Sequence, residues 1–583
     1  MKVTIRFSAL ALALCMLAGC SSAAPESSDG ASSPTVSGEP APVSHEGEVS
    51  ITLSDEGVLV DGTAAPADGS APVYTARDIV YYEDRDTYDS GNVYGEGTDT
   101  DKHTAEEAEE HIVVHITQPG TYRLSGTLSR GQIAVDLGED AKRDPEAVVT
   151  LILDGANITC TVAPAVMFYN VYECDTAWVA YDEEEAEEYA ADPVQDTSAA
   201  GANVILADGS VNNINGSYVA RIYKDNDQQK KLHKYDGAFY SKMSMNMDGE
   251  TEGTGVLNII AENEGLDSEL HLTINGGRIN IQSQNDGVNT NEDGVSVTTI
   301  NGGSLHIVAG LGDEGDGVDS NGYLVVNGGT VIAIAKPQSD SGLDSDLGSY
   351  INGGWVLATG STMDWAESNS DQVTMNLQFA SAQGADAAII VTDLEGNVVF
   401  AYDPDKDETT GFNNRAYQGA ILSCPSFAVG ETYYVYVGGD VTGTEENGLY
   451  HPATVTGFDG AVRQQYTGTD VGMGKGGIGG QRPDGEWAEP PEGMEPGQRP
   501  EGEMPGQRPE GEEPPEMSGD RAPDGKPDGA AGDREPPEGW QGGRVPGGTD
   551  DGTQPGGQQT ASVLFYMTDK VNSFSGISDE VTQ

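Results

Sequence analysis

The chain has 583 residues and a formal net charge of −67, because 29 lysines and arginines stand against 96 aspartates and glutamates. So acidic a surface would repel nucleic-acid phosphates, which excludes nucleic acid as a partner. The charge suits divalent cations and partners bridged through them, and it also favours a soluble monomer.

The first twenty residues are typical of a bacterial lipoprotein signal. Lys2 and Arg6 precede a short apolar run, Phe7–Leu17, and residues 17–20 read LAGC, which matches a lipoprotein signal-peptidase site. The apolar run is too short to remain as a transmembrane helix. We therefore predict a signal peptide over residues 1–19, lipidation of Cys20, and an extracytoplasmic chain anchored to the cell membrane by lipid.

Residues 20–72 are rich in Ser, Ala, Pro, Gly and Glu, which predicts a flexible tether. From Val73 onward, runs such as HIVVHI, GTYRLSG, QIAVDL and VVTLILDGANI alternate apolar with polar residues between turn residues. This pattern predicts short β-strands. The acidic stretch over residues 182–192 is interpreted as a solvated insert.

Three cysteines remain after the signal peptide and the lipidated Cys20 are set aside: Cys160, Cys174 and Cys424. In an oxidising compartment, closeness in the sequence favours a disulfide between Cys160 and Cys174, with Cys424 left over. The alternative is that all three are buried free thiols.

A repeat begins near residue 274. The motif Ile/Val-Asn-Gly-Gly starts at Ile274, Ile300, Val326 and Ile351, so its copies are 26, 26 and 25 residues apart. Short strands at this period, with no leucine-rich or nonapeptide signature, predict an all-β solenoid, namely a right-handed parallel β-helix over residues 73–382. Asn275, Asn301, Asn327 and Asn352 are expected to stack as an asparagine ladder, and the glycines after them to supply positive φ at a tight corner.

A second, acidic motif lies between these copies, as in DGVNTN at residue 286, DGVDSN at residue 316 and SGLDSD at residue 341. In stacked coils, Asp319 would lie one rung from Asp344 and one rung from Asn289. Like charges on neighbouring strands destabilise a sheet, and only Arg278 and Lys336 are positive between residues 265 and 360.

Either these corners point into water or a cation lies between the rungs. Ca²⁺ takes about six to eight oxygen ligands, which such corners offer. We predict bound Ca²⁺, with the candidate ligands Asp267, Glu269, Asp286, Asn289, Asn291, Asp313, Asp316, Asp319, Asn321, Asp344 and Asp346.

The run GTYRLSG…QIAVD…VTLILDGANIT, followed by coils with DGxDS and INGG, resembles the carbohydrate-binding parallel β-helix family of clostridial surface lipoproteins. The resemblance extends over about Tyr74–Asp364. It implies calcium on the helix, ligands at the acidic corners, and binding of cellulose-like and acidic pectic polysaccharides without established catalysis. The early coil at Asp236-Gly237-Ala238-Phe239 lacks the second carboxylate, so fewer ions are expected there.

Pectate-type lyases use the same fold and metal, so catalysis is the first alternative to binding. Elimination needs a base together with Arg or Lys beside the metal, and this face has almost no basic residues. Hydrolysis needs two or three converging carboxylates, which the inventory does not exclude. Because the carboxylates repeat regularly, we expect a non-catalytic binder; a structural or adhesive surface solenoid is the other alternative.

Sugar binding also favours flat aromatic platforms. The candidates are Tyr323, Tyr350, Trp355 and Trp365. For Trp355 the alternative is coil packing, since it follows INGG at an expected strand position. Trp365 follows the last clear coil, so its alternative is a role in capping the solenoid.

The composition and the strand pattern of the sequence change in the C-terminal third of the chain. Residues 383–470 contain alternating strands with tight turns, which predict a small antiparallel β unit capping the solenoid or standing beside it. Residues 471–560 are rich in Gly, Pro and Glu and are predicted to be disordered. Residues 561–583 are strand-like again, and we expect Ser562–Val571 to return and pair with the β unit.

Overall fold

A computed structural model describes residues 47–79, 105–183, 185–219, 235–337, 339–361, 364–406, 415–470 and 561–581. The chain divides into two compact units, Met1–Ser44 and His45–Gln583, and all described residues belong to the second. The predictions for the signal peptide, Cys20, tether residues 20–46 and segment 471–560 therefore lie outside the described residues. No described helix is long and apolar enough to cross a membrane.

The described part is all-β with long sheets, as predicted, and short helices such as α1 (Ala105–Glu109) and α2 (Thr176–Asp182) are its exceptions. The tether prediction is wrong from residue 49. Strand β1 (Val49–Leu53) pairs in parallel with β6 (Gly120–Leu128), and it buries Ile51 and Leu53. The segment VSITL alternates apolar and polar residues, so its pattern is that of a strand. The hairpin β2 (Leu59–Val60) and β3 (Thr63–Ala64) extends β1, and β4 (Val73–Ala76) pairs with β5 (Ile112–Ile116).

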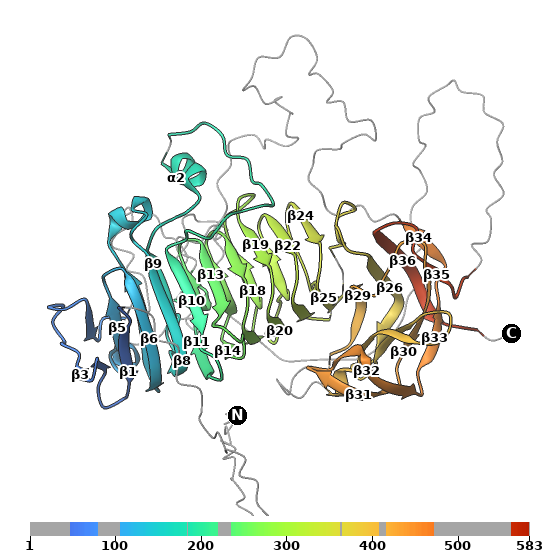
Figure 1. Ribbon diagram of the computed structural model, residues 1–583, viewed down its shortest axis with the longest axis horizontal. Coiled ribbons are helices and arrows are strands. Elements are labelled where there is room, and N and C mark those ends of the chain that lie inside the picture. The colour runs from blue at the N-terminus through green and yellow to red at the C-terminus, as the bar shows by residue number, and fades with distance from the viewer. Residues whose placement is uncertain are drawn as a thin grey trace, which may run out of the picture. The chain divides into compact units, whose positions relative to one another are not determined.

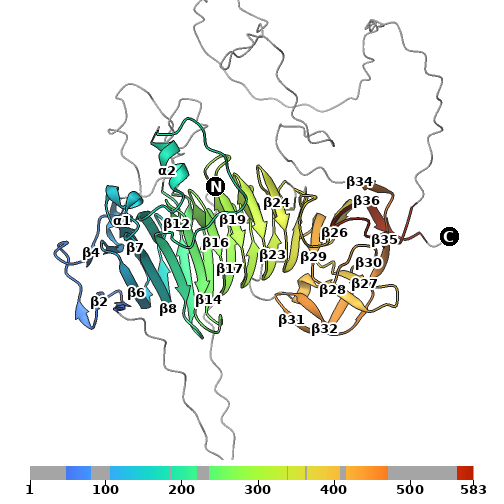
Figure 2. The same cartoon turned by 45° about the horizontal axis from the view of Figure 1, so that its top comes forward.

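From residue 112 to residue 360 the chain forms three parallel ladders of strands (Figures 1 and 2). The first ladder contains β6, β8 (Val149–Thr159), β10 (Ala202–Leu206), β13 (Met245–Gly249), β16 (Leu272–Ile274), β19 (Val297–Ile300), β22 (Tyr323–Val326) and β24 (Gly348–Ile351). The second continues from the end of β8 through β11 (Val211–Gly216), β14 (Val256–Ala261), β17 (Arg278–Ser283), β20 (Ser304–Val308), β23 (Thr330–Ile334) and β25 (Trp355–Gly360). The third contains β5, β7 (Gly131–Asp136), β9 (Val166–Asn170), β12 (Gly237–Ser241), β15 (Glu264–Ser268), β18 (Val288–Thr290) and β21 (Val318–Ser320).

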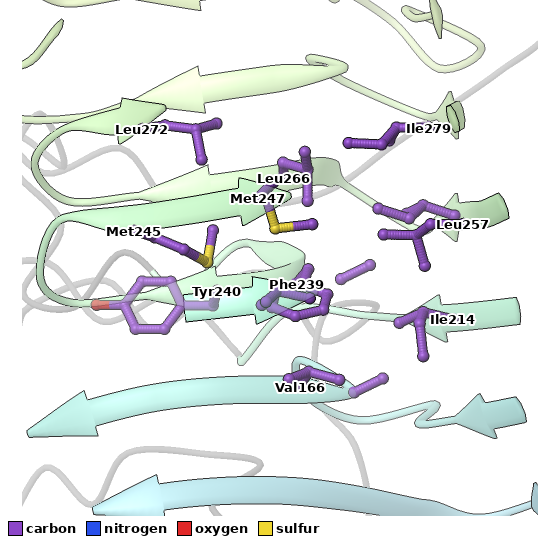
Figure 3. Close-up of a cluster of buried hydrophobic side chains, with 14 of the residues drawn as sticks. Val166, Ile214, Phe239, Tyr240, Met245, Met247, Leu257, Leu266, Leu272 and Ile279 are labelled. Atoms are coloured by element: carbon purple, nitrogen blue, oxygen red, sulfur yellow. The ribbon is translucent and has the colours of Figure 1, made fainter. Parts of the chain in front are cut away.

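The hydrophobic core lies between the ladders. Figure 3 shows apolar side chains from all three pointing toward one another. They are Met245, Met247 and Leu272 from the first ladder, Ile214, Leu257 and Ile279 from the second, and Val166, Phe239 and Leu266 from the third. Their burial is the main favourable term that holds successive coils together.

The predicted asparagine ladder is confirmed. The Nδ2 atoms of Asn301, Asn327 and Asn352 donate to the Oδ1 atom of the preceding asparagine at 2.9, 2.9 and 3.0 Å. The second glycine of each motif has positive φ, for example +78° at Gly303. A second ladder, which the sequence analysis missed, runs on the outside of the second sheet ladder through Asn157, Asn213, Asn258 and Asn280.

The C-terminal unit is antiparallel apart from one parallel pair. Its strands are β26 (Thr374–Gln383), β27 (Ile389–Thr392), β28 (Val398–Tyr402), β29 (Tyr417–Ser423), β30 (Thr432–Val437), β31 (Asp440–Glu446), β32 (Leu449–Asp459), β33 (Val462–Gln465), β34 (Gly468–Asp470), β35 (Phe565–Tyr566) and β36 (Val571–Asp579). The parallel pair is β26–β36. Because β26 already pairs with β29, the strands of this unit begin before the predicted boundary at residue 383.

The predicted return of the C-terminal segment is confirmed. Tyr566 pairs with Thr432 and Phe565 with Tyr433, and Ser562 bridges to Tyr466. The unit meets the last coil through the antiparallel pair β25–β29, which covers the exposed edge that β25 would otherwise present.

Candidate functional site

The acidic motif forms a column along the third ladder. Asp267 pairs with Asn289 and Asn289 with Asp319, while a bridge from Val318 to Leu343 brings Asp344 to the next rung. The preceding residues Leu266, Val288, Val318 and Leu343 are fully buried in the core. Because side chains alternate along a strand, the polar residues face the other side of the ladder.

The carboxylates one position before Gly265, Gly287 and Gly317 stack in the same way. The N–H of Gly265 donates to the carbonyl of Asp286, and the N–H of Gly287 donates to the carbonyl of Asp316. We use the term acidic column for Glu264, Asp267, Asp286, Asn289, Asp316, Asp319 and Asp344. Glu264 is a member that the sequence analysis missed, although Glu264-Gly265 occupies the position of Asp286-Gly287.

The motif glycines explain why the coils approach so closely here. A Cβ atom on Gly287 would lie 2.6 Å from the carbonyl oxygen of Gly317, and closer still to Cγ2 of Ile307. Gly265, Gly317 and Gly342 are equally crowded by the next coil and by core side chains. Only glycine fits such positions, and the adjoining carboxylates are therefore held one strand spacing apart.

Burial and mutual repulsion make ionisation of this column costly. Asp267 is 0% and Asp286 8% exposed. Burial raises the pKa of Asp267 well above its usual range, with further contributions from Glu264 and Glu269. Burial also raises the pKa of Asp286 well above its usual range, and the nearby charges of Glu264, Asp319 and Asp316 add to the rise.

Asp316 shows the same effect with a smaller shift. Burial raises its pKa to about 8; a hydrogen bond from the N–H of Ser341 opposes the rise, and Asp344 and Asp319 add to it. A cation among these oxygens would relieve the penalty.

Hydrogen bonds occupy some of the side-chain oxygen atoms of the acidic column. The N–H of Asp316 donates to Asp286 Oδ1 at 2.7 Å, and Asn289 Nδ2 donates to Glu264 Oε1 at 3.1 Å. Asn289 is only 7% exposed, and its Oδ1 atom has no hydrogen-bond partner among the residues that the structure describes. An unsatisfied buried oxygen is expensive, which makes this amide oxygen a candidate cation ligand.

The remaining predicted ligands divide into two groups. Glu269 accepts from the Tyr240 hydroxyl at 3.1 Å, Asn291 donates to Asp267, and Asn321 donates to the carbonyl of Asn291. These three flank the column, whereas Asp313 and Asp346 are exposed. Within the described ranges, no three His, Cys, Asp or Glu side chains form a ready metal-binding group. Calcium at the column stays a prediction.

Two of the four predicted sugar-stacking aromatics are packing residues. Trp355 stacks on Phe400 at 6.1 Å and meets His451 edge-on at 4.8 Å, both in the C-terminal unit. Trp365 is partly buried against the main core. Both side chains remain partly exposed, so their assignment to sugar binding stays a prediction beside this packing role. Tyr323 and Tyr350 form a half-buried pair with ring centroids 5.9 Å apart.

A pocket of about 580 Å³, which the sequence analysis did not predict, lies beside the acidic column. We call it the aromatic pocket; its lining residues are Glu139, Lys142, Tyr169, Asn170, Trp178, Asp182, Tyr235, Tyr240, Lys242, Met243, Glu269 and Glu292. The residues come from η2 (Glu139–Arg143), α2 and the ends of β9, β12, β15 and β18. They are spread over more than a hundred residues, so no local motif indicates the pocket.

Helix α2, which carries Trp178, is tied to the coils through Asp175. As N-cap, Asp175 accepts from the N–H groups of Ala177 and Trp178, both at 3.0 Å. It also accepts from the Tyr189 hydroxyl at 2.5 Å and lies 3.2 Å from His271 Nε2. Burial opposes ionisation of Asp175, but hydrogen bonds from His271 and Tyr189 lower its pKa to about 2.

His271 directly precedes strand β16 of the first ladder and is buried. The N–H of Val297 donates to its Nδ1 atom, so Nε2 carries the hydrogen that faces Asp175. The helix is therefore fixed to the coils from which the pocket is built.

The predicted disulfide is wrong: Cys160, Cys174 and Cys424 are free thiols. Cys160 follows β8, whereas Cys174 lies beyond the far end of β9, so an extended strand separates them. Five residues of strand span about 16 Å, and a disulfide needs Cα atoms within about 7 Å. Burial raises the pKa of both thiols to about 12, so neither is a reactive thiolate.

The family model for a carbohydrate-binding domain-containing protein matches residues 110–189 and 186–404, and the chain belongs to this family. A carbohydrate-binding domain-containing protein of Acetivibrio thermocellus is 30% identical over 171 residues, which are 29% of this chain and 45% of that protein. The chain thus spans less than half the length of that relative. A solved structure, the polysaccharide lyase-like protein from C. thermocellum in a gadolinium derivative, is 22% identical and covers 53% of this chain and 92% of its own. Its TM-score of 0.30 is too low to establish a shared fold.

Proposed function

We propose that this protein is a cell-surface lipoprotein that binds polysaccharide, without cleaving it, through a calcium-loaded right-handed parallel β-helix. Its family supplies the general activity, carbohydrate binding. The observation that carries the finer proposal is the acidic column. Buried carboxylates of successive coils are stacked there around the Oδ1 atom of Asn289, which no described residue contacts by a hydrogen bond.

The β-helix rests on the order of the strands. Successive strands of the chain alternate among three parallel ladders, and one apolar core lies between them. Parallel strands that recur in this order are typical of a solenoid, which needs no helical crossover.

Calcium fits the donors of the acidic column, which are carboxylate and amide oxygens. Asp286, Asn289, Asp316 and Asp319 are the residues that would hold it, with Glu264 and Asp344 on the adjoining rungs. A bound ion would neutralise the column and offer further ligand positions to the carboxylates of an acidic glycan. The residues of the column would then fix the position of the ion along the third ladder.

The basic residues of the repeat support binding without elimination. Arg278 is exposed on the second ladder and pairs with Glu446 at 3.2 Å. Lys336 donates to the carbonyls of Gly312 and Asp313. These contacts lie outside the acidic column, whereas a lyase would need a basic side chain beside the metal. A lyase or hydrolase, and a purely structural solenoid, are the alternatives that the following test separates.

The mature ectodomain, migrating through gels that contain polygalacturonate or a soluble cellulose derivative, is expected to be retarded. Retardation by polygalacturonate should be lost in chelator, because the acidic column would then repel the glycan. Absence of retardation on every gel, with calcium present, would contradict the proposal in favour of a structural solenoid. Release of unsaturated or reducing ends during incubation would replace binding with catalysis.

A further inference from the structure

The aromatic pocket is a second glycan site, and we propose that it binds a short neutral pyranose oligosaccharide without calcium. This inference rests on the proposed function, polysaccharide binding. It gives the protein a second binding site, which presents different chemical groups to the sugar. The acidic column and the aromatic pocket adjoin through Tyr240 and Glu269, but they offer a ligand different groups.

Four aromatic residues line the pocket. Tyr235 and Tyr240 are buried, 5% and 0% exposed, and their rings meet edge to face at 5.0 Å. Tyr169, on β9, packs against Tyr235 at 6.0 Å, and Tyr169 and Trp178 of α2 are the two that are partly exposed. The apolar faces of pyranose rings bind to such surfaces, and a volume of about 580 Å³ lies within the range of small-ligand sites.

The polar groups of the pocket favour a neutral sugar. Two lysines, Lys142 and Lys242, stand against four carboxylates, those of Glu139, Asp182, Glu269 and Glu292, so the lining has a formal charge of −2. Both lysines are engaged within the protein. Lys142 pairs with Asp182 at 3.4 Å and Glu183 at 2.8 Å, and the Lys242 ammonium lies 4.5 Å from the centroid of the Tyr169 ring.

An anionic sugar would face this excess of negative charge without a free cation among the described lining residues. The hydroxyls of a neutral sugar, in contrast, can donate to the carboxylate oxygens around the aromatic rings and need no free cation. The geometry therefore points to a neutral oligosaccharide.

Isothermal titration of the mature ectodomain with cellotetraose in chelator tests this assignment. We expect binding, with affinity unchanged by calcium, and a loss of about tenfold or more in Trp178→Ala. Trp178→Phe should retain part of the affinity. Tyr181→Ala is the matched control, because Tyr181 lies on the same helix, is 42% exposed and does not line the pocket. Tyr169→Ala removes a wall on a different element, in case the Trp178→Ala variant does not fold.

The pocket assignment would be overturned if the Trp178→Ala and Tyr169→Ala variants bound cellotetraose as tightly as the unaltered protein does. It would also be overturned if cellotetraose binding required calcium. Titration with tetragalacturonate in calcium keeps the two proposals apart. If the protein binds tetragalacturonate but not cellotetraose, the pocket assignment fails and the proposed function stands. If it binds neither sugar and no polysaccharide retards it, both fail.

Discussion

The double variant Asp316→Asn, Asp319→Asn is expected to have a lower melting temperature than the unaltered protein in calcium. In chelator its melting temperature should be the higher of the two. In calcium the variant lacks two carboxylate ligands, and its affinity for the ion should fall by about tenfold or more, which is about 1.4 kcal/mol. In chelator the charge of Asp319 repels that of Asp316, and burial disfavours the charged form of Asp316. Neutral amides of similar shape remove that repulsion.

Melting curves of both proteins, recorded with calcium and with chelator, test whether the order of the two melting temperatures reverses. Asp313→Asn is the control, because Asp313 belongs to the same acidic stretch but is exposed and lies outside the acidic column. Curves that coincide in calcium and chelator for the unaltered protein would contradict calcium binding at the column.

The pH dependence of stability gives a second signature of the metal-free column. Because burial raises the pKa of Asp316 to about 8 in the folded protein, from an unfolded value near 3.8, folding favours its protonated form. This contribution to stability is fully present below about pH 4 and is lost as the pH rises toward about 8. In chelator, the urea midpoint should therefore fall over this range, and saturating calcium should abolish most of the fall. A midpoint in chelator that does not change with pH would contradict the interpretation.

Gly287→Ala is expected to destabilise the protein strongly, because the acidic motif leaves no room for a methyl group at this position. The new Cβ atom would lie 2.6 Å from the carbonyl oxygen of Gly317 and closer to Ile307, which is fully buried in the core. Neither can move without separating two coils. We expect a loss of about 3 kcal/mol in the free energy of unfolding, or an insoluble protein.

Gly457→Ala is the matched control for this substitution. Gly457 also lies in a strand, β32, but the nearest atom to its added Cβ would be Thr442 Oγ1 at 3.6 Å, an ordinary contact. Its unfolding free energy should change by less than about 1 kcal/mol. Urea unfolding followed by circular dichroism compares the two variants, and similar midpoints would show that the glycine column tolerates a side chain.

The predictions that the structure confirms depend on residues that recur at one period. Asn275, Asn301, Asn327 and Asn352 occupy equivalent positions in successive coils, so a single spacing places all four in one ladder. Asp267, Asn289, Asp319 and Asp344 lie 22, 30 and 25 residues apart, but they occupy equivalent positions of the acidic motif and stack in the same way. Glu264 precedes Gly265 as Asp286 precedes Gly287, so the same comparison places it in the acidic column, although the predicted ligands did not include it.

The all-β class, the register of the repeats and the stacking of the acidic motif can be deduced from the amino acids alone, because each depends on a motif that recurs along the chain and on the size of glycine. Other features follow only from the folded chain. The C-terminal unit packs against Trp355, the length of β9 separates Cys160 from Cys174, and residues from 139 to 292 meet in the aromatic pocket. These outcomes depend on contacts between segments that share no period, and the distance between such segments is set by how the whole chain packs.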